Sequence, residues 1–472
     1  MTEAPARSNS GCLDSVFRYG ERTDASSRFS DVTLRAFDTV AEQPLAFPQR
    51  PGGLNPLVGG ANTEIAQSED AFQLRVQAPL GAKNAPVVVF VPGGGFMTGS
   101  GNARWFTSPE LVERAGVVLV TVNYRIGALG HLGSTGQPAE SQGGLRDLIV
   151  ALRWVNEHIA EFGGNPNQVT LSGDSAGAWY AFALSALEET RGLFTRAALI
   201  SLPWEPPLAA GAYAERRDLV ASELDGIGGL DGAAIEQVLA AQSALSQAYA
   251  GRGMALMPAA AGEVTGDLHD YTSVASRLHI SELALLSTSE EAAAFLFPAP
   301  DQAFSPESVG GFIGAKFDDP AKVSEWIAQK RPDATPKQRM IEAMTLHQFR
   351  LANLELAEAT TAAGIPTYVA SLSLQSPLPG ALSPHCFPLP FLFGDREVWH
   401  DAPMLDGLDD AVFDQTSRAL QDWFLGFVTS GIPSVKGEGG ERFDPLHPAR
   451  VEFDGDAVRS ETPSELGLVA RR

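Results

Sequence analysis

Residues 169–177 read Val169-Thr170-Leu171-Ser172-Gly173-Asp174-Ser175-Ala176-Gly177, an apolar run that enters a Gly-x-Ser-x-Gly turn. Small residues follow the turn, as is typical where a helix starts close against a strand. The pattern predicts a strand-turn-helix unit that lifts the hydroxyl group of Ser175 above the end of a sheet. Glycines on both sides remove the Cβ atoms that would otherwise clash in so sharp a turn. The stretch therefore indicates an α/β fold with a serine nucleophile, although Gly-x-Ser-x-Gly alone also occurs in ordinary turns.

Short apolar segments rich in β-branched residues alternate with helical patterns along the chain. Apolar residues recur at the spacing of one helix face from Leu145 to Phe162, and Gly163-Gly164-Asn165-Pro166 ends that helix. Continuous apolar runs are typical of strands covered on both faces, so we expect a mainly parallel central sheet flanked by helices. The predicted strands are 86–91, 117–122, 168–171, 197–201, 284–287 and 366–372.

Two Ala-rich, mostly helical segments interrupt this alternation, at about 203–280 and 300–363. We interpret them as insertions that roof a site within one domain spanning residues 1–472. The polar, Gly-rich stretch 434–442 is expected to be a surface loop.

Charge and composition restrict the possible partners. The formal net charge of −23 provides no basic surface for nucleic acid, so we expect no such partner. No run approaches the roughly 18 apolar residues that cross a bilayer, and residues 1–15 lack a secretory signal pattern, so we expect no membrane contact and a cytoplasmic protein. The chain has only two cysteines, and we expect Cys12 to lie in a mobile N-terminal tail without a bridge to Cys386. Neither the cysteines nor an H-E-x-x-H pattern offers a metal site, so no metal or organic cofactor is expected; the oligomeric state is left open.

A second motif precedes the serine. The apolar segment that ends at Val91 runs into Pro92-Gly93-Gly94-Gly95-Phe96. Three consecutive glycines allow backbone N–H groups to approach a ligand closely. With the N–H group of Ala176, those of Gly94 and Gly95 would form an oxyanion hole, the alternative being a flexible turn after a strand.

Several collinear stretches resemble the type-B carboxylesterase family, which includes the cholinesterases, and within it the bacterial p-nitrobenzyl-esterase-like members. The resemblance implies an α/β-hydrolase fold with helical insertions over the active site and a Ser-acid-His triad in that chain order. The resembling stretches are 68–76, the triple-glycine loop, 121–130, 142–177, 385–394 and 399–403.

The resemblance implies His385 as the catalytic base, because a family histidine precedes a Phe-Gly ending at the distance at which Phe393-Gly394 stands here. His400 is the alternative base, although it follows Trp399 in a stretch that resembles a structural part of the family.

The triad acid depends on the alignment of residues 285–295. Alignment of Phe295 with a family aromatic residue places Glu291 on the catalytic glutamate and Glu290 on the aspartate before it. Glu290 remains the alternative acid, and a gap-free alignment would place Ala292 there and leave no acid.

The implied activity is hydrolysis of neutral carboxylic esters through an acyl-enzyme, with Ser175, Glu291 and His385 as the triad. The same machinery could cleave a carbamate, lactone, thioester or activated amide, and a non-catalytic binding protein is the third possibility. Pro92 stands where the family has His, and Ala71 stands where secreted members have a bridged cysteine. Four aromatic residues are candidates for an apolar substrate pocket, although each could belong to the core: Phe96, Trp179, Trp204 and Phe391.

Overall fold

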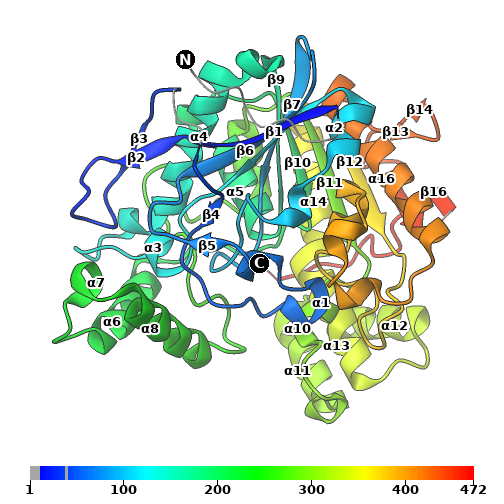
Figure 1. Ribbon diagram of the computed structural model, residues 1–472. Coiled ribbons are helices and arrows are strands. Elements are labelled where there is room, and N and C mark those ends of the chain that lie inside the picture. Colours follow the sequence, from blue (N-terminus) through cyan, green and yellow to red (C-terminus); the bar gives the residue numbers. More distant parts are fainter. Residues whose placement is uncertain (1–10, 38–40, 456, 472) are drawn as a thin grey trace. The chain divides into compact units, whose positions relative to one another are not determined.

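The computed structural model describes residues 11–37, 41–455 and 457–471 (Figure 1). The chain divides into two units. The first comprises Met1–Gly52, Gly60–Ala197 and Pro206–Ile280, and the second comprises Gly53–Gly59, Ala198–Glu205 and Ser281–Arg472.

In the first unit, the strands of the large sheet follow the order β1-β6-β8-β7-β9. β7 runs parallel to both β8 and β9, whereas β6 pairs antiparallel with β1 and β8. Every residue of β8 is buried, as expected for a strand covered on both faces. The bounds are β1 Cys12–Arg18, β6 Gln73–Pro79, β7 Ala85–Val91, β8 Val118–Val122 and β9 Gly164–Asp174.

The helix predicted from the 3.6-residue periodicity is confirmed. It is α4, Gly143–His158, extended by a 3₁₀ turn over Ile159–Phe162. Gly163 ends it with φ +80°, a left-handed conformation that favours glycine. α5, Ala176–Ser185, is buried at every residue, which explains its lack of a polar face. Two shorter helices of this unit are α2, Pro109–Ala115, and α3, Gly127–His131.

The segment predicted as helical between 203 and 280 holds four helices of the first unit, green in Figure 1. Buried side chains of α6, α7 and α8, among them Tyr213 and Leu245, share a hydrophobic cluster with Leu132. The cluster shows that α6, α7 and α8 fold onto the rest of their own unit, while the role of the segment as a roof stays a prediction. They are α6 Ala210–Glu223, α7 Gly229–Gly232, α8 Ile235–Ala248 and α9 Tyr271–Val274.

In the second unit, the strands of the large sheet follow the order β11-β12-β15-β16. β12 is parallel to β11 and β15, and β16 pairs antiparallel with β15. The predicted mainly parallel central sheet is therefore confirmed, with antiparallel pairs at β1, β6 and β8 in the first unit and at β15 and β16 in the second. The bounds are β11 Glu282–Thr288, β12 Thr367–Leu372, β15 Arg450–Asp454 and β16 Ala457–Glu461, while β10, Arg196–Ile200, spans the division between the units.

Helices also fill the second predicted insertion, from 300 to 363. A π-helical turn, Leu346–Arg350, joins α13 to α14 there. The helices of the second unit are α1 Asn55–Val58, α10 Ala292–Leu296, α11 Pro306–Lys316, α12 Pro320–Lys330, α13 Pro336–Thr345, α14 Leu351–Ala362, α15 Pro388–Phe393 and α16 Asp410–Ser430.

Two sequence expectations were wrong. Cys12 does not lie in a mobile tail: it begins β1, is 1% exposed, and its thiol donates to the carbonyl oxygen of Ala78. The stretch 434–442 is not a plain loop, because β13 (Ser434–Val435) and β14 (Glu438–Gly439) form a hairpin. Lys436 and Gly437 both have positive φ, the conformation that a two-residue hairpin turn requires. The N-terminal signal prediction concerns residues 1–15, of which 1–10 lie outside the described residues.

Four short two-residue or three-residue strands complete the first unit: β2 Gly20–Arg22, β3 Val32–Leu34, β4 Leu45–Ala46 and β5 Ala66–Gln67. None of the helices formed by residues 11–37, 41–455 and 457–471 combines the length and apolar character of a membrane span.

Candidate active site

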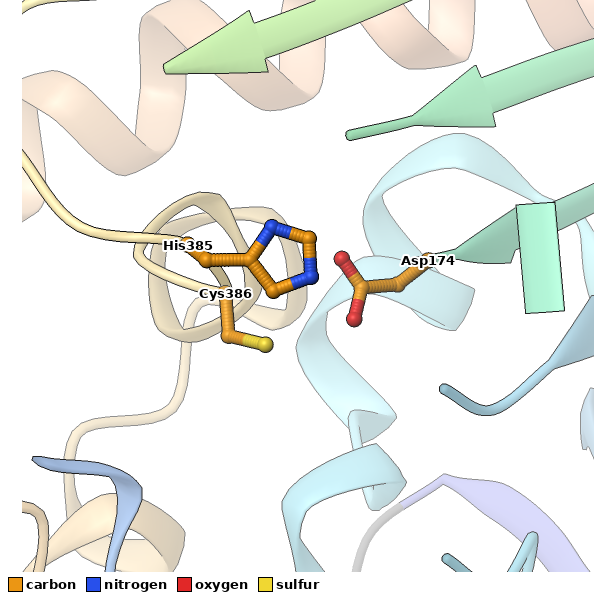
Figure 2. Close-up of side chains that lie close together, drawn as sticks. All are labelled: Asp174, His385 and Cys386. Atoms are coloured by element: carbon orange, nitrogen blue, oxygen red, sulfur yellow. The ribbon is translucent and has the colours of Figure 1, made fainter. Parts of the chain in front are cut away.

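Ser175 occupies a strained turn between β9 and α5. Its backbone has φ +56° and ψ −121°, and it is the N-cap residue of α5. A non-glycine residue adopts this conformation only where the surrounding structure enforces it, and such strain concentrates at functional sites. Asp174, labelled in Figure 2, is the last residue of β9, so the strand delivers Ser175 directly at its carboxyl end. The predicted strand-turn-helix unit is therefore present.

The two glycines of the motif have no room for side chains. A Cβ atom on Gly177 would lie 1.9 Å from the carbonyl oxygen of Val91, and one on Gly173 would lie 2.4 Å from the carbonyl carbon of Gly177. Both distances are far below van der Waals contact, so only glycine lets the turn pack between β7 and α5.

The triple-glycine loop lies against the same turn. A Cβ atom on Gly93 would be 3.0 Å from the Cβ atom of Ser175. Gly94 and Gly95 have φ values of +127° and +59°, which favour glycine. Within the part of the chain that the structure describes, no acceptor is bonded to the N–H groups of Gly94, Gly95 or Ala176. The loop thus brings backbone donors to the side of Ser175.

Two buried side chains support this loop where the family's histidine is missing. The hydroxyl group of Tyr124 donates to the carbonyl oxygen of Pro92 at 2.7 Å. Burial, with a smaller contribution from the charge of Asp174, raises the pKa of Tyr124, so the hydroxyl group stays a donor. His131 lies with Nε2 3.3 Å from the carbonyl oxygen of Phe96 and Nδ1 3.1 Å from that of Ser141. Burial lowers the pKa of His131 to about 4, so near neutral pH the uncharged ring can donate to only one of the two carbonyl groups.

Glu291 and His385 form a buried pair in the second unit. Glu291 lies between β11 and α10, and His385 lies on the segment between β12 and α15, next to Cys386 (Figure 2). The Nδ1 atom of His385 is 2.5 Å from the Oε2 atom of Glu291, and the side chains are 1% and 0% exposed. An ionised carboxylate only accepts, so Nδ1 is the donor and Nε2 is the nitrogen available as a base.

The second carboxylate oxygen of Glu291 has two donors of its own. The hydroxyl group of Ser201 and the backbone N–H of Thr288 each donate to Oε1 at 2.7 Å. These hydrogen bonds orient the carboxylate toward His385. Sequence reasoning did not single out Ser201, because a serine at the end of a strand carries no local signal of a partner 90 residues away.

Glu290 and His400, the alternative acid and base, do not contact the Glu291–His385 pair through their side chains. Glu290 directs its carboxylate to the backbone N–H of Ser383 rather than to the imidazole. His400 is exposed, and its Nδ1 atom is 2.8 Å from the carbonyl oxygen of Glu397. Of the candidate acids and bases, only Glu291 and His385 are brought together.

Two phenylalanines that the site prediction omitted flank the imidazole of His385. The ring centroid of Phe295 is 5.0 Å from that of His385, and the ring centroid of Phe349 is 5.4 Å from it. Phe295 is 43% exposed, an unusual fraction for a large apolar side chain beside a buried pair. Phe295 had served only to align the acidic residues.

The four aromatic residues predicted for a substrate pocket fall into two groups. In the first unit, Phe96 and Trp179 contact each other edge to face with ring centroids 5.6 Å apart, and both are buried. In the second unit, Trp204 contacts His347 at 5.7 Å, and Phe391 packs against Phe387 at 5.1 Å. Their role toward a substrate stays a prediction.

Comparisons with known proteins agree with this geometry. A profile of the Carboxylesterase family matches residues 37–220. A probable N-octanoylanthranilate hydrolase of Rhodococcus erythropolis is 31% identical over 409 residues, covering 82% of each chain. Phenmedipham hydrolase of Pseudarthrobacter oxydans is 28% identical over 411 residues, covering 84% of this chain and 80% of that one. A solved structure of a PNB esterase superposes with a TM-score of 0.81 at 25% identity, covering 98% of this chain and 96% of the other.

A serine at a strained strand-to-helix turn and parallel sheets flanked by helices define a hydrolase of the α/β-hydrolase fold. Within that class, the chain belongs to the carboxylesterase family and is a carboxylic-ester hydrolase.

Proposed function

We propose that this protein hydrolyses neutral carboxylic esters through an acyl-enzyme formed on Ser175. His385 takes the proton from the hydroxyl group of Ser175 as its oxygen attacks the ester carbonyl carbon, and then gives the proton to the departing alcohol. Water, activated by the same imidazole, then attacks the acyl-enzyme and releases the acid. The observation that carries the proposal is the backbone of Ser175, which holds a non-glycine residue at φ +56°.

Glu291 fixes the imidazole for both proton transfers. Its contact with Nδ1 at 2.5 Å sets the tautomer in which Nε2 is the base, and its charge stabilises the imidazolium that forms. The same contact between Glu291 and Nδ1 therefore serves both acylation and deacylation.

The backbone N–H groups of Gly94, Gly95 and Ala176 are proposed to bind the oxyanion. The positive φ values of the two glycines direct the loop backbone to the side of Ser175, and Ala176 opens α5, where the helix dipole favours negative charge. Loss of one such donor lowers kcat by about 10²–10³-fold in a comparable oxyanion hole.

A second candidate function is hydrolysis of an N-acyl bond. The Rhodococcus relative that matches over 82% of this chain is named for N-octanoylanthranilate, whose acyl group is attached to nitrogen. The triad determines that an acyl group is transferred but not which leaving group departs. Ser175 could therefore attack either an ester or an N-acyl bond.

The test compares wild type with Ser175→Ala on the p-nitrophenyl esters of acetate, butyrate and octanoate, and on p-nitroacetanilide and p-nitrooctananilide. We expect ester turnover by the wild type that is abolished in the variant, with the chain-length profile reporting the size of the acyl pocket. Faster turnover of the anilides than of the esters would favour the second candidate. Equal activity of wild type and variant would exclude Ser175 as the nucleophile.

A further inference from the structure

The carboxylate of Glu290 is buried beside the proposed triad acid without contacting His385. It is 3% exposed, and it accepts hydrogen bonds from the hydroxyl group of Ser289 at 2.7 Å and from the side-chain amide of Gln375 at 2.9 Å. These donors stabilise the buried carboxylate, because a buried charge without partners is strongly unfavourable.

The carboxylate of Glu290 is also hydrogen-bonded to the backbone of the segment that carries His385. The N–H of Ser383 donates to Oε2 of Glu290 at 3.2 Å, and the N–H of Glu290 donates back to the carbonyl oxygen of Ser383 at 3.3 Å. Two residues further on, the N–H of His385 donates to the carbonyl oxygen of Glu291 at 3.3 Å. Residues 290–291 and 383–385 are thus connected by three hydrogen bonds in addition to the Glu291–His385 pair.

The hydrogen bonds that join residues 290–291 to residues 383–385 are called the clamp below. Arg331 connects the clamp to the helices of the second unit. It follows α12, pairs with Oε1 of Glu290, and donates to Oε2 of Glu342 at 3.0 Å. Glu342 is fully buried on α13 and also pairs with Lys330 at 2.7 Å and Arg350 at 2.8 Å. Burial opposes the charge of Glu342, but the surrounding cations prevail and its pKa is lowered. Arg331 therefore ties the clamp to a second, fully buried carboxylate, that of Glu342, rather than to exposed groups.

We propose that Glu290 is a positioning residue of the active site, which holds the Ser383–His385 segment so that the imidazole stays on Glu291, with Arg331 as its anchor. This inference rests on the proposed function, because it assumes that His385 transfers the proton. Displacement of a catalytic group by about 1 Å can lower the rate of a reaction about 10²-fold, even when the displaced residue keeps its chemistry.

The test compares Glu290→Ala, Glu290→Asp and Arg331→Met, with Lys330→Met as the matched control. Lys330 precedes Arg331 and pairs with the same Glu342, but it does not contact Glu290. The measured quantities are kcat and KM on p-nitrophenyl butyrate, expressed per site titrated with a p-nitrophenyl phosphonate, and the downfield proton resonance of His385 Nδ1.

We expect Glu290→Ala to lower kcat per titrated site by about 10²-fold with KM nearly unchanged, and to broaden or shift the Nδ1 proton resonance. Glu290→Asp should restore most of the rate, because it keeps a carboxylate in the clamp. Arg331→Met should show a smaller loss of kcat, and Lys330→Met should retain the wild-type kcat.

A purely structural role gives a different pattern. If Glu290→Ala only reduced the fraction of titratable sites, while each site kept its kcat and its Nδ1 resonance, the proposal would be overturned. Should that variant fail to fold, Arg331→Met decides in the same way, because a wild-type kcat and resonance would show that the clamp does not position His385. Failure of the proposed function is distinguishable, since Ser175→Ala would then keep its activity and the phosphonate would not label the wild type.

Discussion

The Oε2 atom of Glu291 lies 2.5 Å from the Nδ1 atom of His385, while its Oε1 atom accepts two hydrogen bonds from other residues. Both oxygens of the Glu291 side chain therefore accept hydrogen bonds. A carboxylate has two accepting oxygens, whereas the amide of glutamine has only one.

Glu291→Gln is expected to lower kcat by about 10⁴-fold, as the corresponding amide does in a serine protease triad. A glutamine amide has one donor end, which must face either His385 Nδ1 or the Ser201 and Thr288 donors, so one contact becomes donor against donor. The measurement is kcat on p-nitrophenyl butyrate. Glu282→Gln, at the start of β11, the strand that precedes Glu291, is the control and should keep the wild-type kcat. An activity of Glu291→Gln close to that of wild type would remove Glu291 from the triad.

Ser201→Ala and Ser201→Gly test the support of Glu291. Both remove the hydroxyl group that donates to Oε1, so both should lower kcat by about tenfold, the effect expected for one hydrogen bond to a charged group. Ser201 also has φ +51°, where a Cβ atom is unfavourable, so Ser201→Gly should be more stable than Ser201→Ala by about 1 kcal/mol. Enzyme kinetics and thermal unfolding separate the two effects. Equal stability of the two variants together with wild-type kcat would contradict both arguments.

The turn around Ser175 could be predicted from the sequence because everything that forms it is local. The strand, the two glycines and the small residues that open α5 all lie within residues 169–178. The six predicted strands are present for a similar reason, since buried parallel strands are continuous apolar runs. β1 was not predicted, because its buried and half-buried residues form no continuous apolar run. Cys12, its first residue, was therefore wrongly placed in a mobile tail.

The choice between Glu290 and Glu291 could not be made with the same certainty. The two carboxylates are adjacent, and the alignment that favoured Glu291 depended on a gap of one residue. The structure distinguishes them by contacts with segments more than 80 residues away: Glu291 meets His385 and Ser201, and Glu290 meets Ser383. Such contacts arise from the packing of β10, β11 and the segment after β12, which no local pattern encodes.

Gly177→Ala is expected to lower the free energy of unfolding by at least about 3 kcal/mol, the upper range for overpacking. The new Cβ atom would lie 1.9 Å from the carbonyl oxygen of Val91, and rigid backbone on both sides prevents relief. Urea unfolding followed by circular dichroism measures the change. Gly211→Ala is the control: nothing lies within 4 Å of its added Cβ atom, near the start of α6, and it should stabilise the protein slightly. An equal effect of both substitutions would show that crowding at Gly177 is not the cause.

Glu465→Gln is expected to destabilise the protein by about 3–5 kcal/mol at pH 7, because it leaves two buried cations without their shared partner. Glu465 is 0% exposed and pairs with Arg350 at 2.7 Å and with Arg450 at 2.5 Å. Burial would raise the pKa of Glu465, but the two guanidinium groups outweigh it and hold the pKa well below the ordinary 4.5.

The sign of the pH dependence follows from that lowered pKa. The stabilisation by Glu465 is complete above the ordinary pKa of 4.5 and is lost as the pH falls below it toward the folded-state pKa, because the unfolded chain then takes up a proton that the folded chain does not. The stability difference between wild type and Glu465→Gln should therefore narrow between pH 5 and pH 3, as measured by urea unfolding at each pH. Glu438→Gln, an exposed site on β14, should show no such difference at any pH. If the difference in unfolding free energy between wild type and Glu465→Gln stayed constant down to pH 3, the buried ion pairs of Glu465 would not account for a loss of stability in acid.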